Sequence, residues 1–370
     1  MRKKNKISAE EKYYIASQWQ LMWRKFKKHK LAMLGGSILA IFYILAIFCE
    51  FFSPYDIYKR YPDYIYAPPQ RIHFFDEEGD FHLRPFVYGI KQETDPVTWV
   101  TKYSEDEANK YPIYFFVHGD EYKLWNLFPT DIHLFGVEKS GTIFLFGTED
   151  MGRDLFSRNL YAARISLSIG LIGVALTFII GVILGGISGY YGGAADMIIQ
   201  RVIEFLISIP VIPLWMALAA ALPKDWPMIK VYFGIIIILS LIGWGGLARV
   251  VRGKFLQLRE EDFCMAAKMA GAGETRIITR HLLPSFLSYL IVNLTLAIPG
   301  MILGETALSF LGLGLRPPAV SWGVLLYKAQ NIRTVVLYPW IFFPALFVII
   351  TVLTFNFLGD GLRDAADPYK

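Results

Sequence analysis

Six long apolar segments divide the chain, and they constrain its fold more strongly than any other feature of the sequence. The hydrocarbon core of a bilayer is about 30 Å thick, and a helix needs about 20 mostly apolar residues to cross it. The segments lack the alternation of apolar and polar residues that outer-membrane strands show, so we expect helices rather than a β-barrel. The expected spans are residues 31–52, 165–190, 194–222, 228–250, 284–313 and 335–358.

The composition agrees with an all-α polytopic membrane protein. Apolar residues make up 54% of the 370-residue chain and charged residues make up 19%, whereas soluble domains have about 45–50% and about 25%. The two cysteines, Cys49 and Cys264, are too few for a disulfide scaffold. Segment 194–222 carries Asp196, Arg201 and Glu204, so we expect it to lie inside a bundle, away from lipid.

The distribution of basic residues predicts the side of the membrane on which each connection lies. About ten Lys and Arg residues occur in residues 1–30 and seven in the connection 249–281, whereas residues 53–163 are acidic on balance. Positive charge favours the cytoplasmic side, so we expect both termini and this connection in the cytoplasm. The first apolar segment begins only at position 31 and lacks a small-residue cleavage site, so it should remain as a membrane anchor.

Residues 1–30 are predicted to form a cytoplasmic amphipathic helix, beginning near Ser8. Ser8 and Glu11 match a capping box, and apolar residues from Ile15 to Phe26 recur at three- and four-residue steps. Tryptophan beside basic residues suits the headgroup zone of a membrane. The alternative is a helix whose apolar face packs on another part of a protein.

Residues 53–146 are predicted to form a small, mostly β extracytoplasmic insert between the first and second spans. Three hairpins are expected, over residues 71–86 with a turn at Gly79, 114–127 with a turn at 118–120, and 133–146 around 138–141. The insert also contains four histidines, whose wide spacing matches no zinc-ligand pattern, so we predict no metal site. These histidines are His73, His82, His118 and His133.

The chain lacks the motifs of common catalytic folds, which indicates a non-catalytic protein. Gly253-Lys254 comes closest to a phosphate-binding loop, but Ala248 stands at the position of its first glycine and Phe255 follows the lysine. The sequence contains no H-E-x-x-H, C-x-x-C or G-x-S-x-G motif. We therefore expect this chain to bind no cofactor and no nucleic acid.

The connection 252–283 carries the strongest functional signal. Residues 260–270 predict a short helix, with acidic residues where the helix dipole favours them and Gly271 positioned as a C-terminal stop. A second helix is expected over residues 274–283, before Pro284 opens the fifth span.

The predicted short helix has a shape that suits a partner protein. Phe263, Ala266, Ala267 and Ala270 are expected on one face, because they recur at three- and four-residue spacing. The alanines leave this face shallow while Phe263 projects, as in helices seated in the groove of another protein.

This pattern resembles the EAA loop of ABC importer permeases, in which two alanines, a glycine and a Leu-Pro pair follow at fixed spacing. The chain matches it at Ala266, Ala267, Gly271, Leu283 and Pro284. It departs at Met265, where the general pattern has Glu, and at His281, where it has Ile. The resemblance implies an ATPase-coupling helix that involves Glu260, Glu261, Phe263, Ala266, Ala267, Lys268, Gly271 and Pro284.

Further stretches resemble the C-type permease subunit of oligopeptide/dipeptide-type ABC importers. They are residues 23–32, 146–158, 163–167, 189–193, 308–314, 317–323 and 356–364. The resemblance covers roughly residues 19–56 and 146–370 and leaves 66–145 unexplained. It implies a six-helix permease core of the type I importer kind over 147–360, a cytoplasmic tail over 361–370, and location in a prokaryotic cytoplasmic membrane.

The resemblance also implies partners and cargo. Such a subunit pairs with a homologous B-type permease, with two cytoplasmic ATPases that hold ATP-Mg, and with an extracytoplasmic solute-binding protein, all at a lipid membrane. The implied cargo is oligopeptides or dipeptides, and oligosaccharides or another solute are the alternative for the same machinery. A secondary transporter is a more distant alternative, for which inverted repeats or several paired intramembrane carboxylates would be expected.

Three polar residues within the apolar segments are candidates for a translocation path or gate. Glu305 lies deep in the fifth span, where a carboxylate is costly unless it is paired or faces water. A structural partner such as Arg249, or a neighbouring subunit, is the alternative role for Glu305. Asn293 and Asn356 are the other two candidates, and hydrogen bonding between helices is their alternative role.

Overall fold

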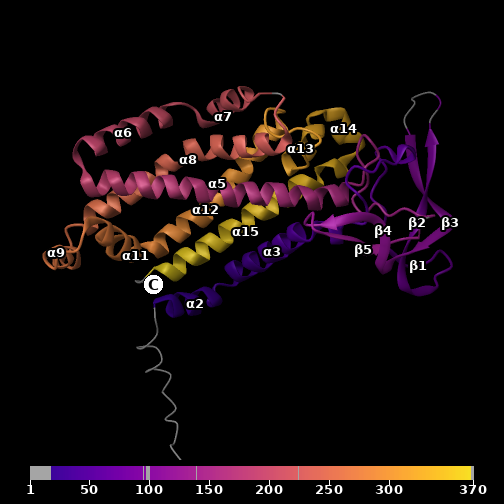
Figure 1. Cartoon of the computed structure of the whole chain (residues 1–370). Coiled ribbons are helices and arrows are strands. Elements are labelled where there is room, and N and C mark those ends of the chain that lie inside the picture. The colour runs from indigo at the N-terminus through magenta and orange to yellow at the C-terminus, as the bar shows by residue number, and fades with distance from the viewer. Residues whose placement is uncertain (1–17, 95, 97–100, 139, 224, 368–370) are drawn as a thin grey trace, which may run out of the picture.

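The computed structural model describes residues 18–367, apart from positions 95, 97–100, 139 and 224. Long helices make up most of it, with the β strands at one end and α9 (Asp262–Met269) at the other (Figure 1). We call these the strand end and the α9 end. The long helices are α3 (Lys30–Ile47), α5 (Leu155–Tyr191), α8 (Met228–Leu258), α12 (Leu287–Phe310) and α15 (Phe343–Ala366).

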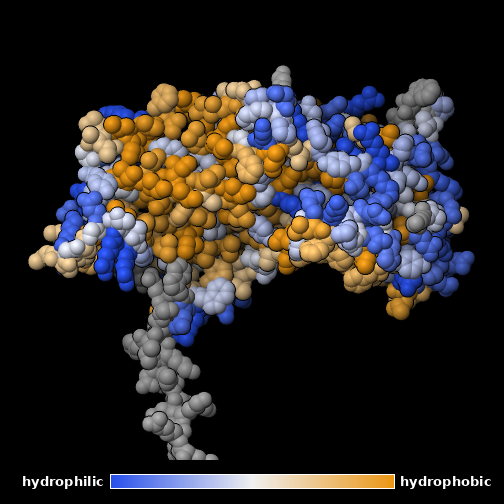
Figure 2. Space-filling view, in the orientation of Figure 1, coloured by the Kyte–Doolittle hydropathy of each residue, from blue (hydrophilic) through white to orange (hydrophobic). Residues whose placement is uncertain are grey.

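The helical part carries an apolar belt of the kind that faces lipid. Figure 2 shows hydrophobic residues over the sides of the helices and hydrophilic residues toward the strand end and the α9 end. Among the described residues, five helices are long and apolar enough to cross a membrane, or up to six spans if one bent pair counts as a single span. A mostly helical, multi-pass arrangement is therefore confirmed.

The bent pair consists of α6 (Gly193–Ser208) and α7 (Val211–Ala220), which meet at 89°. Pro210 explains the break, because it lacks a backbone donor and disfavours the helical conformation at Ile209, whose ψ is 131°. The expectation that this segment lies inside a bundle is wrong for the single chain. Of the 16 described residues of α6, only Ile203 is buried, and the acidic side chains of α6 form ion pairs with arginines.

Helix α5 lies at the centre of the helical part and packs against α3, α8 and α12. Gly181, Gly185 and Gly189 form a stripe at four-residue spacing along α5, and such stripes allow two helices to approach closely. A Cβ atom at Gly185 would lie 2.5 Å from the carbonyl oxygen of Ala248 on α8. The α5–α8 contact is therefore closer than a side chain at this position would permit.

The helices do not keep the boundaries of the predicted spans: α5 begins at Leu155 rather than at 165, and α8 continues to Leu258 rather than to 250. Helix α3 ends at Ile47, and α4 (Cys49–Phe52) follows after a break at Phe48. Helix α15 begins at Phe343 rather than near 335, because α14 (Ile332–Leu337) and η4 (Pro339–Phe342) come first. Tyr338 separates these two short helices, as expected for a residue that precedes a proline.

Helix α2 (Gln18–Lys28) agrees with the end of the predicted N-terminal helix, whose first part, residues 8–17, lies outside the described residues. Phe26 is buried in a cluster with Ala32 of α3 and Ala365 of α15. His29 separates α2 from α3 and caps α3, since its Nδ1 accepts a hydrogen bond of 3.1 Å from the backbone N–H of Ala32. Part of the apolar face of α2 thus packs within the chain, as in the alternative interpretation of this segment.

The strands form two sheets in the part of the chain between α4 and α5. The antiparallel strands β1 (His73–Phe75), β2 (Phe81–Thr94) and β3 (Thr101–Pro112) form one sheet in that order, and β4 (Tyr114–Leu124) pairs with β5 (Phe128–Gly136) in the other. A short helical turn, η1 (Pro62–Tyr64), precedes them. Val87, Ile113 and Ile143 form a small buried core in this region. A small β-rich part therefore exists, as predicted.

Only the first of the three predicted hairpins is confirmed among the described residues. Its turn, between β1 and β2, contains Gly79 at φ +86°. The second prediction is wrong, because residues 118–120 lie within β4 at an irregularity of its pairing and the chain turns at 125–127. The third is wrong because no strand occurs in the described part of 137–146. Bulges and turns use similar glycine-containing sequences, which explains the error.

Candidate functional site

Helix α9 forms at the position that the sequence predicts. It spans Asp262–Met269, with Glu261 in an extended conformation immediately before it and Glu260 one residue earlier. Asp262 lies in the first turn, where the helix dipole favours a carboxylate. Gly271 has φ +79°, which residues other than glycine rarely adopt, and it follows the end of the helix as expected.

Helix α9 has an inner side and an outer side. On the inner side, Cys264 and Ala267 are buried in an apolar cluster with Ile277 and Leu282. The prediction that Ala267 shares one partner-facing surface with Ala266 is wrong, because Ala267 is buried against the chain whereas Ala266 is exposed. The other residues of α9 are exposed, with Phe263, Met265, Ala266 and Met269 on the outer side and Lys268 at its edge, near Tyr190 of α5.

The helix predicted over 274–283 is present, but its centre is irregular. The elements α10 (Glu274–Arg276), η2 (Ile277–Leu282) and α11 (Leu283–Ser285) follow one another directly, and η2 is a π-helical turn. Such turns are rare and frequently occur at functional sites. Pro284 lies in α11 rather than at the start of the fifth span, because a break at Phe286 delays the start of α12 to Leu287.

Contacts with the end of α5 hold this connection in place. The hydroxyl of Tyr191 donates a hydrogen bond of 3.0 Å to Oε2 of Glu274. Nη1 of Arg259 donates to the carbonyl oxygen of Tyr190 at 3.2 Å, and Nζ of Lys268 lies 5.9 Å from the centre of the Tyr190 ring. Helix α9 is therefore attached to a helix that extends to the strand end (Figure 1).

An ion pair on the same side of the molecule joins α6 to α8. Nε and Nη2 of Arg252 donate to the two carboxylate oxygens of Asp196, each at 2.6 Å. A bidentate pair of this kind fixes the relative orientation of its two groups. No local sequence pattern predicted this pair or the tyrosine contacts, because their partners are far apart along the chain; Asp196 and Arg252 are 56 residues apart.

Glu305 on α12 is completely buried and is surrounded by serines. Its carboxylate accepts hydrogen bonds of 2.7 Å from Ser309 and from Ser321, and one of 3.4 Å from Ser166 on α5. Ser321 is the N-cap of α13 (Trp322–Leu326). Arg249, considered above as a partner, is exposed on α8. Hydroxyl groups thus satisfy the carboxylate, and Glu305 joins α5, α12 and the start of α13.

Asn293 and Asn356, the other predicted path residues, do not share a site with Glu305. Asn293 lies 12 residues before Glu305 on α12, which is about 18 Å along the helix axis. It lines a cavity of about 570 Å³ together with Lys254 of α8 and Arg363 of α15. Asn356 is half-buried on α15 and is not among the residues that line this cavity. The structure therefore does not bring the three residues together.

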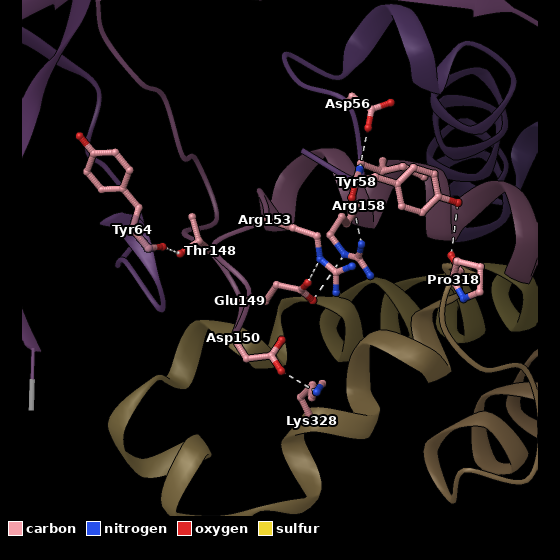
Figure 3. Close-up of polar contacts among 11 residues, drawn as sticks. Asp56, Tyr58, Tyr64, Thr148, Glu149, Asp150, Arg153, Arg158, Pro318 and Lys328 are labelled. Carbon is pink, nitrogen blue, oxygen red and sulfur yellow. Dashed lines mark hydrogen bonds and ion pairs between the residues drawn. The ribbon is translucent and has the colours of Figure 1, made fainter. Parts of the chain in front are cut away.

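An ion-pair network lies at the strand end, just before α5. Figure 3 shows the carboxylate of Glu149 beside the guanidinium groups of Arg153 and Arg158, with Nε of Arg158 3.4 Å from Oε2 of Glu149. Asp150 forms a second pair, at 2.5 Å, with Lys328 in η3 (Tyr327–Gln330). The network thus connects the start of α5 with the connection that follows α12. Sequence reasoning singled out this stretch without assigning it a structural role.

Asp154 caps α5 next to this network. Its Oδ2 accepts hydrogen bonds from the backbone N–H of Ser157 at 2.7 Å and from the Ser157 hydroxyl at 2.6 Å. The carboxyl group is buried, and this burial raises its pKa to about 6, because the hydrogen bonds only partly offset the loss of hydration. Asp154 therefore titrates closer to neutral pH than an exposed aspartate does.

Two protein-family models match this chain. Residues 181–369 match the binding-protein-dependent transport system inner membrane component family. Residues 17–69 match the N-terminal TM domain of oligopeptide transport permease C. The first match contains α9 and its attachments, and the second contains α2 and α3.

Similar proteins carry related names. The dipeptide transport system permease protein DppC of Bacillus subtilis (strain 168) is 32% identical over 367 residues, which cover 99% of this chain and 90% of that protein. The oligopeptide transport system permease protein OppC of the same strain is 41% identical over 224 residues, 60% of this chain and 71% of that protein. OppC of Haemophilus influenzae is 42% identical over 224 residues, 60% of this chain and 70% of that protein.

Proposed function

Because the chain belongs to the family of binding-protein-dependent transport system inner membrane components, we propose that it is the permease subunit of an ATP-driven importer of dipeptides or oligopeptides. Proteins of this family are non-catalytic, multi-pass components of the inner membrane, and the ATPase is a partner. The names of the dipeptide and oligopeptide permeases that resemble the chain support a peptide cargo. An oligosaccharide or another solute is the alternative cargo.

The two-sided structure of α9 is the observation that carries this proposal. Its inner residues, Cys264 and Ala267, fix the helix to the chain, while Phe263 and Ala266 are exposed and available to a partner. A helix held in the groove of an ATPase transmits domain closure as a rigid-body movement. The contact between Lys268 and Tyr190 supports transfer of this movement to α5. We therefore assign α9 as the coupling helix, with residues 260–271 and Pro284 around it.

The proposed complex contains four kinds of partner. A homologous B-type permease completes the membrane path, two cytoplasmic ATPases bind ATP-Mg, and an extracytoplasmic binding protein delivers the cargo. Lipid covers the remaining apolar belt, and this chain holds no cofactor of its own. The extracytoplasmic β-rich insert, over 53–146, lies on the side of the binding protein.

The proposed topology has six spans and both termini in the cytoplasm. It counts α6 and α7 as one bent span, and it places the segments 1–30 and 361–370 on the same side as the connection 252–283. Basic residues near α9, including Arg252 and Arg259, support a cytoplasmic position for this end. Helix α15 continues to Ala366, so most of the proposed tail is the last part of this helix.

The path and the gate are proposed at separate places. Glu305 is suited to a gate, since its serine contacts join α5, α12 and α13, and a movement of α5 would disturb them. Asn293 is suited to the path because it lines the cavity with Lys254 and Arg363. Asn356 is a path candidate only because of its position within α15.

The coupling role can be tested by replacing an exposed alanine with aspartate, once in α9 and once in β3, in the complete transporter reconstituted in liposomes. We expect Ala266→Asp to lower ATP-driven uptake more than tenfold, because a charge would occupy the shallow surface that the ATPase contacts. The thermal unfolding midpoint should stay unchanged, since Ala266 is exposed. Ala108→Asp makes the same change at an exposed alanine of β3 and should transport normally. Normal uptake by Ala266→Asp would contradict the proposal.

Crosslinking and ligand identification test the partners and the cargo. A bifunctional reagent attached to Phe263→Cys or Lys268→Cys should capture an ATPase in intact membranes, whereas Leu83→Cys on β2 should not. Failure of both α9 positions to capture an ATPase would argue against an importer and in favour of a secondary transporter. Mass spectrometry of the ligand carried by the purified binding protein distinguishes peptides from oligosaccharides.

A further inference from the structure

The tip of the β4–β5 hairpin lies against the end of α3. Nε1 of Trp125 donates a hydrogen bond of 2.9 Å to the carbonyl oxygen of Ile47, the last residue of α3. The ring of Trp125 lies 5.3 Å from that of Phe48, and the rings of Phe51 and Phe116 are 6.2 Å apart. The hairpin tip is therefore attached to the point where an apolar membrane-span candidate ends.

The surface of this tip is apolar and exposed. The exposed fractions at the tip are 45% for Trp125, 70% for Leu127 and 60% for Phe128, and Phe116, earlier in β4 beside Phe51, is 66% exposed. On α3, Ile44 and Ile47 are exposed to a similar extent. The sides of the helices form the apolar belt (Figure 2), and the exposed apolar residues of the hairpin tip lie next to the end of α3.

Three residues of the β4–β5 hairpin have positive φ values, two of them in its turn and one, Phe116, within β4. Phe116, Trp125 and Asn126 have φ values of +56°, +53° and +59°. Bulky residues rarely adopt this left-handed conformation, which costs about 1–3 kcal/mol and clusters at functional positions. Trp125 and Asn126 are the central residues of the turn that is closed by the hydrogen bond from the backbone N–H of Leu127 to the carbonyl oxygen of Leu124, and tight hairpin turns use positive φ at both of these positions. The turn therefore presents the Trp125 ring to the end of α3.

We propose that Phe116, Trp125, Leu127 and Phe128 form an interfacial anchor that inserts into the lipid beside the strand end of α3. Tryptophan and other aromatic residues favour the boundary between headgroups and acyl chains, where one edge of the ring stays polar and the rest is apolar. The contact between Trp125 and Ile47 places the tip at this depth if α3 crosses the membrane. Lys123, next to Leu124 on β4, is exposed and suited to contact phosphate headgroups.

The proposal commits to lipid as the occupant because the tip continues the surface of α3. A second exposed apolar group, Phe75, Phe81 and Leu83 on the β1–β2 hairpin, has no such connection to a span among the described contacts. It therefore serves as an internal control. The inference depends on α3 being a membrane span and not on the peptide cargo, so the two proposals can fail separately.

Spin-label accessibility tests the anchor in the full chain, in nanodiscs that contain phosphatidylcholine and phosphatidylglycerol. A nitroxide at Leu127→Cys should collide mainly with oxygen, which concentrates in lipid, whereas one at Leu83→Cys should collide mainly with a water-soluble nickel chelate. We expect the ratio of oxygen to nickel accessibility to be at least fivefold higher at Leu127. The unmodified chain controls for background labelling, because Cys49 and Cys264 are buried.

Two results would overturn the proposal. Equal ratios at Leu127 and Leu83 would show that the tip lies in water. Low accessibility to both reagents at Leu127 would show that protein covers the tip instead of lipid. Phe128→Cys provides a second label position on the same surface, and both residues are exposed, so neither substitution removes a core contact.

Discussion

The hydroxyl of Tyr191, the last residue of α5, lies 3.0 Å from Oε2 of Glu274, the first residue of α10. Helix α5 has 37 residues. Its other end is at Leu155, just after the ion pairs of Glu149 and Asp150. The α9 connection is therefore attached to an element that spans the molecule (Figure 1). If α9 is the coupling helix, as proposed, this arrangement would carry its movement along α5.

Tyr191→Phe should weaken this coupling without unfolding the protein. The substitution removes the hydrogen bond to Glu274, whose net contribution is about 0.5–1.5 kcal/mol, and we expect uptake per ATP hydrolysed to fall about two- to tenfold. The measurement compares both rates in liposomes that contain the complete transporter. Tyr327→Phe, at an exposed tyrosine of η3, is the matched control. An unchanged ratio for Tyr191→Phe would show that this contact transmits nothing.

Gly271→Val should impair the exit from α9, whereas Gly271→Asn should be tolerated. The φ of +79° is unfavourable for side chains, most of all for β-branched ones, while asparagine adopts it more readily. A Cβ atom at this glycine would meet no atom within 4 Å, so the penalty comes from the backbone alone, about 1–2 kcal/mol. Uptake assays should rank wild type and Gly271→Asn above Gly271→Val. Equal activity of the two variants would contradict this explanation.

Gly185→Val should destabilise the helical part. The new Cβ would lie 2.5 Å from the carbonyl oxygen of Ala248, so α5 and α8 would have to separate. We expect a loss of about 1–3 kcal/mol in the free energy of unfolding, seen as a lower thermal midpoint in detergent. Gly253→Ala on α8 is the control, because a Cβ there meets no atom within 4 Å. Its midpoint should stay the same or rise, and a similar drop in both variants would exclude the packing explanation.

Asp154→Asn should flatten the pH dependence of stability between about pH 4 and pH 6. The buried carboxyl has a pKa raised from 3.8 to about 6, so in this range the folded chain holds a proton that the unfolded chain has lost. The contribution of Asp154 to stability is therefore largest at low pH and decreases as the pH rises through about 6. Asparagine keeps the cap and removes the charge.

Thermal unfolding of wild type, Asp154→Asn and Asp154→Ala across this pH range checks the prediction. Relative to wild type, Asp154→Asn should gain stability as the pH rises from 4 to 7, by on the order of 2–3 kcal/mol. Asp154→Ala should be less stable than Asp154→Asn at every pH, because it also loses the hydrogen bonds to Ser157. Parallel pH profiles for wild type and Asp154→Asn would show that the group does not titrate in this range.

Features that depend on neighbouring residues were predicted well. The long apolar helices follow from local composition, and α9 follows from acidic residues at its start and Gly271 at its end. The turn at Gly79 was predicted for the same reason. In contrast, the turn expected at 118–120 is an irregularity within β4, because a glycine-containing stretch suits both structures and the pairing with β5 decides between them.

The candidate site shows the same difference between features that neighbouring residues determine and features that distant residues determine. Residue spacing alone predicted the existence and position of α9, because helix propensity, capping charges and a glycine stop act over a few residues. It could not predict that Ala267 faces inward or that Glu305 is held by serines of three elements. Those outcomes depend on which distant segments pack together. Tertiary structure decided them because burial and hydrogen-bond partners are set by residues far apart in the chain, which no local pattern specifies.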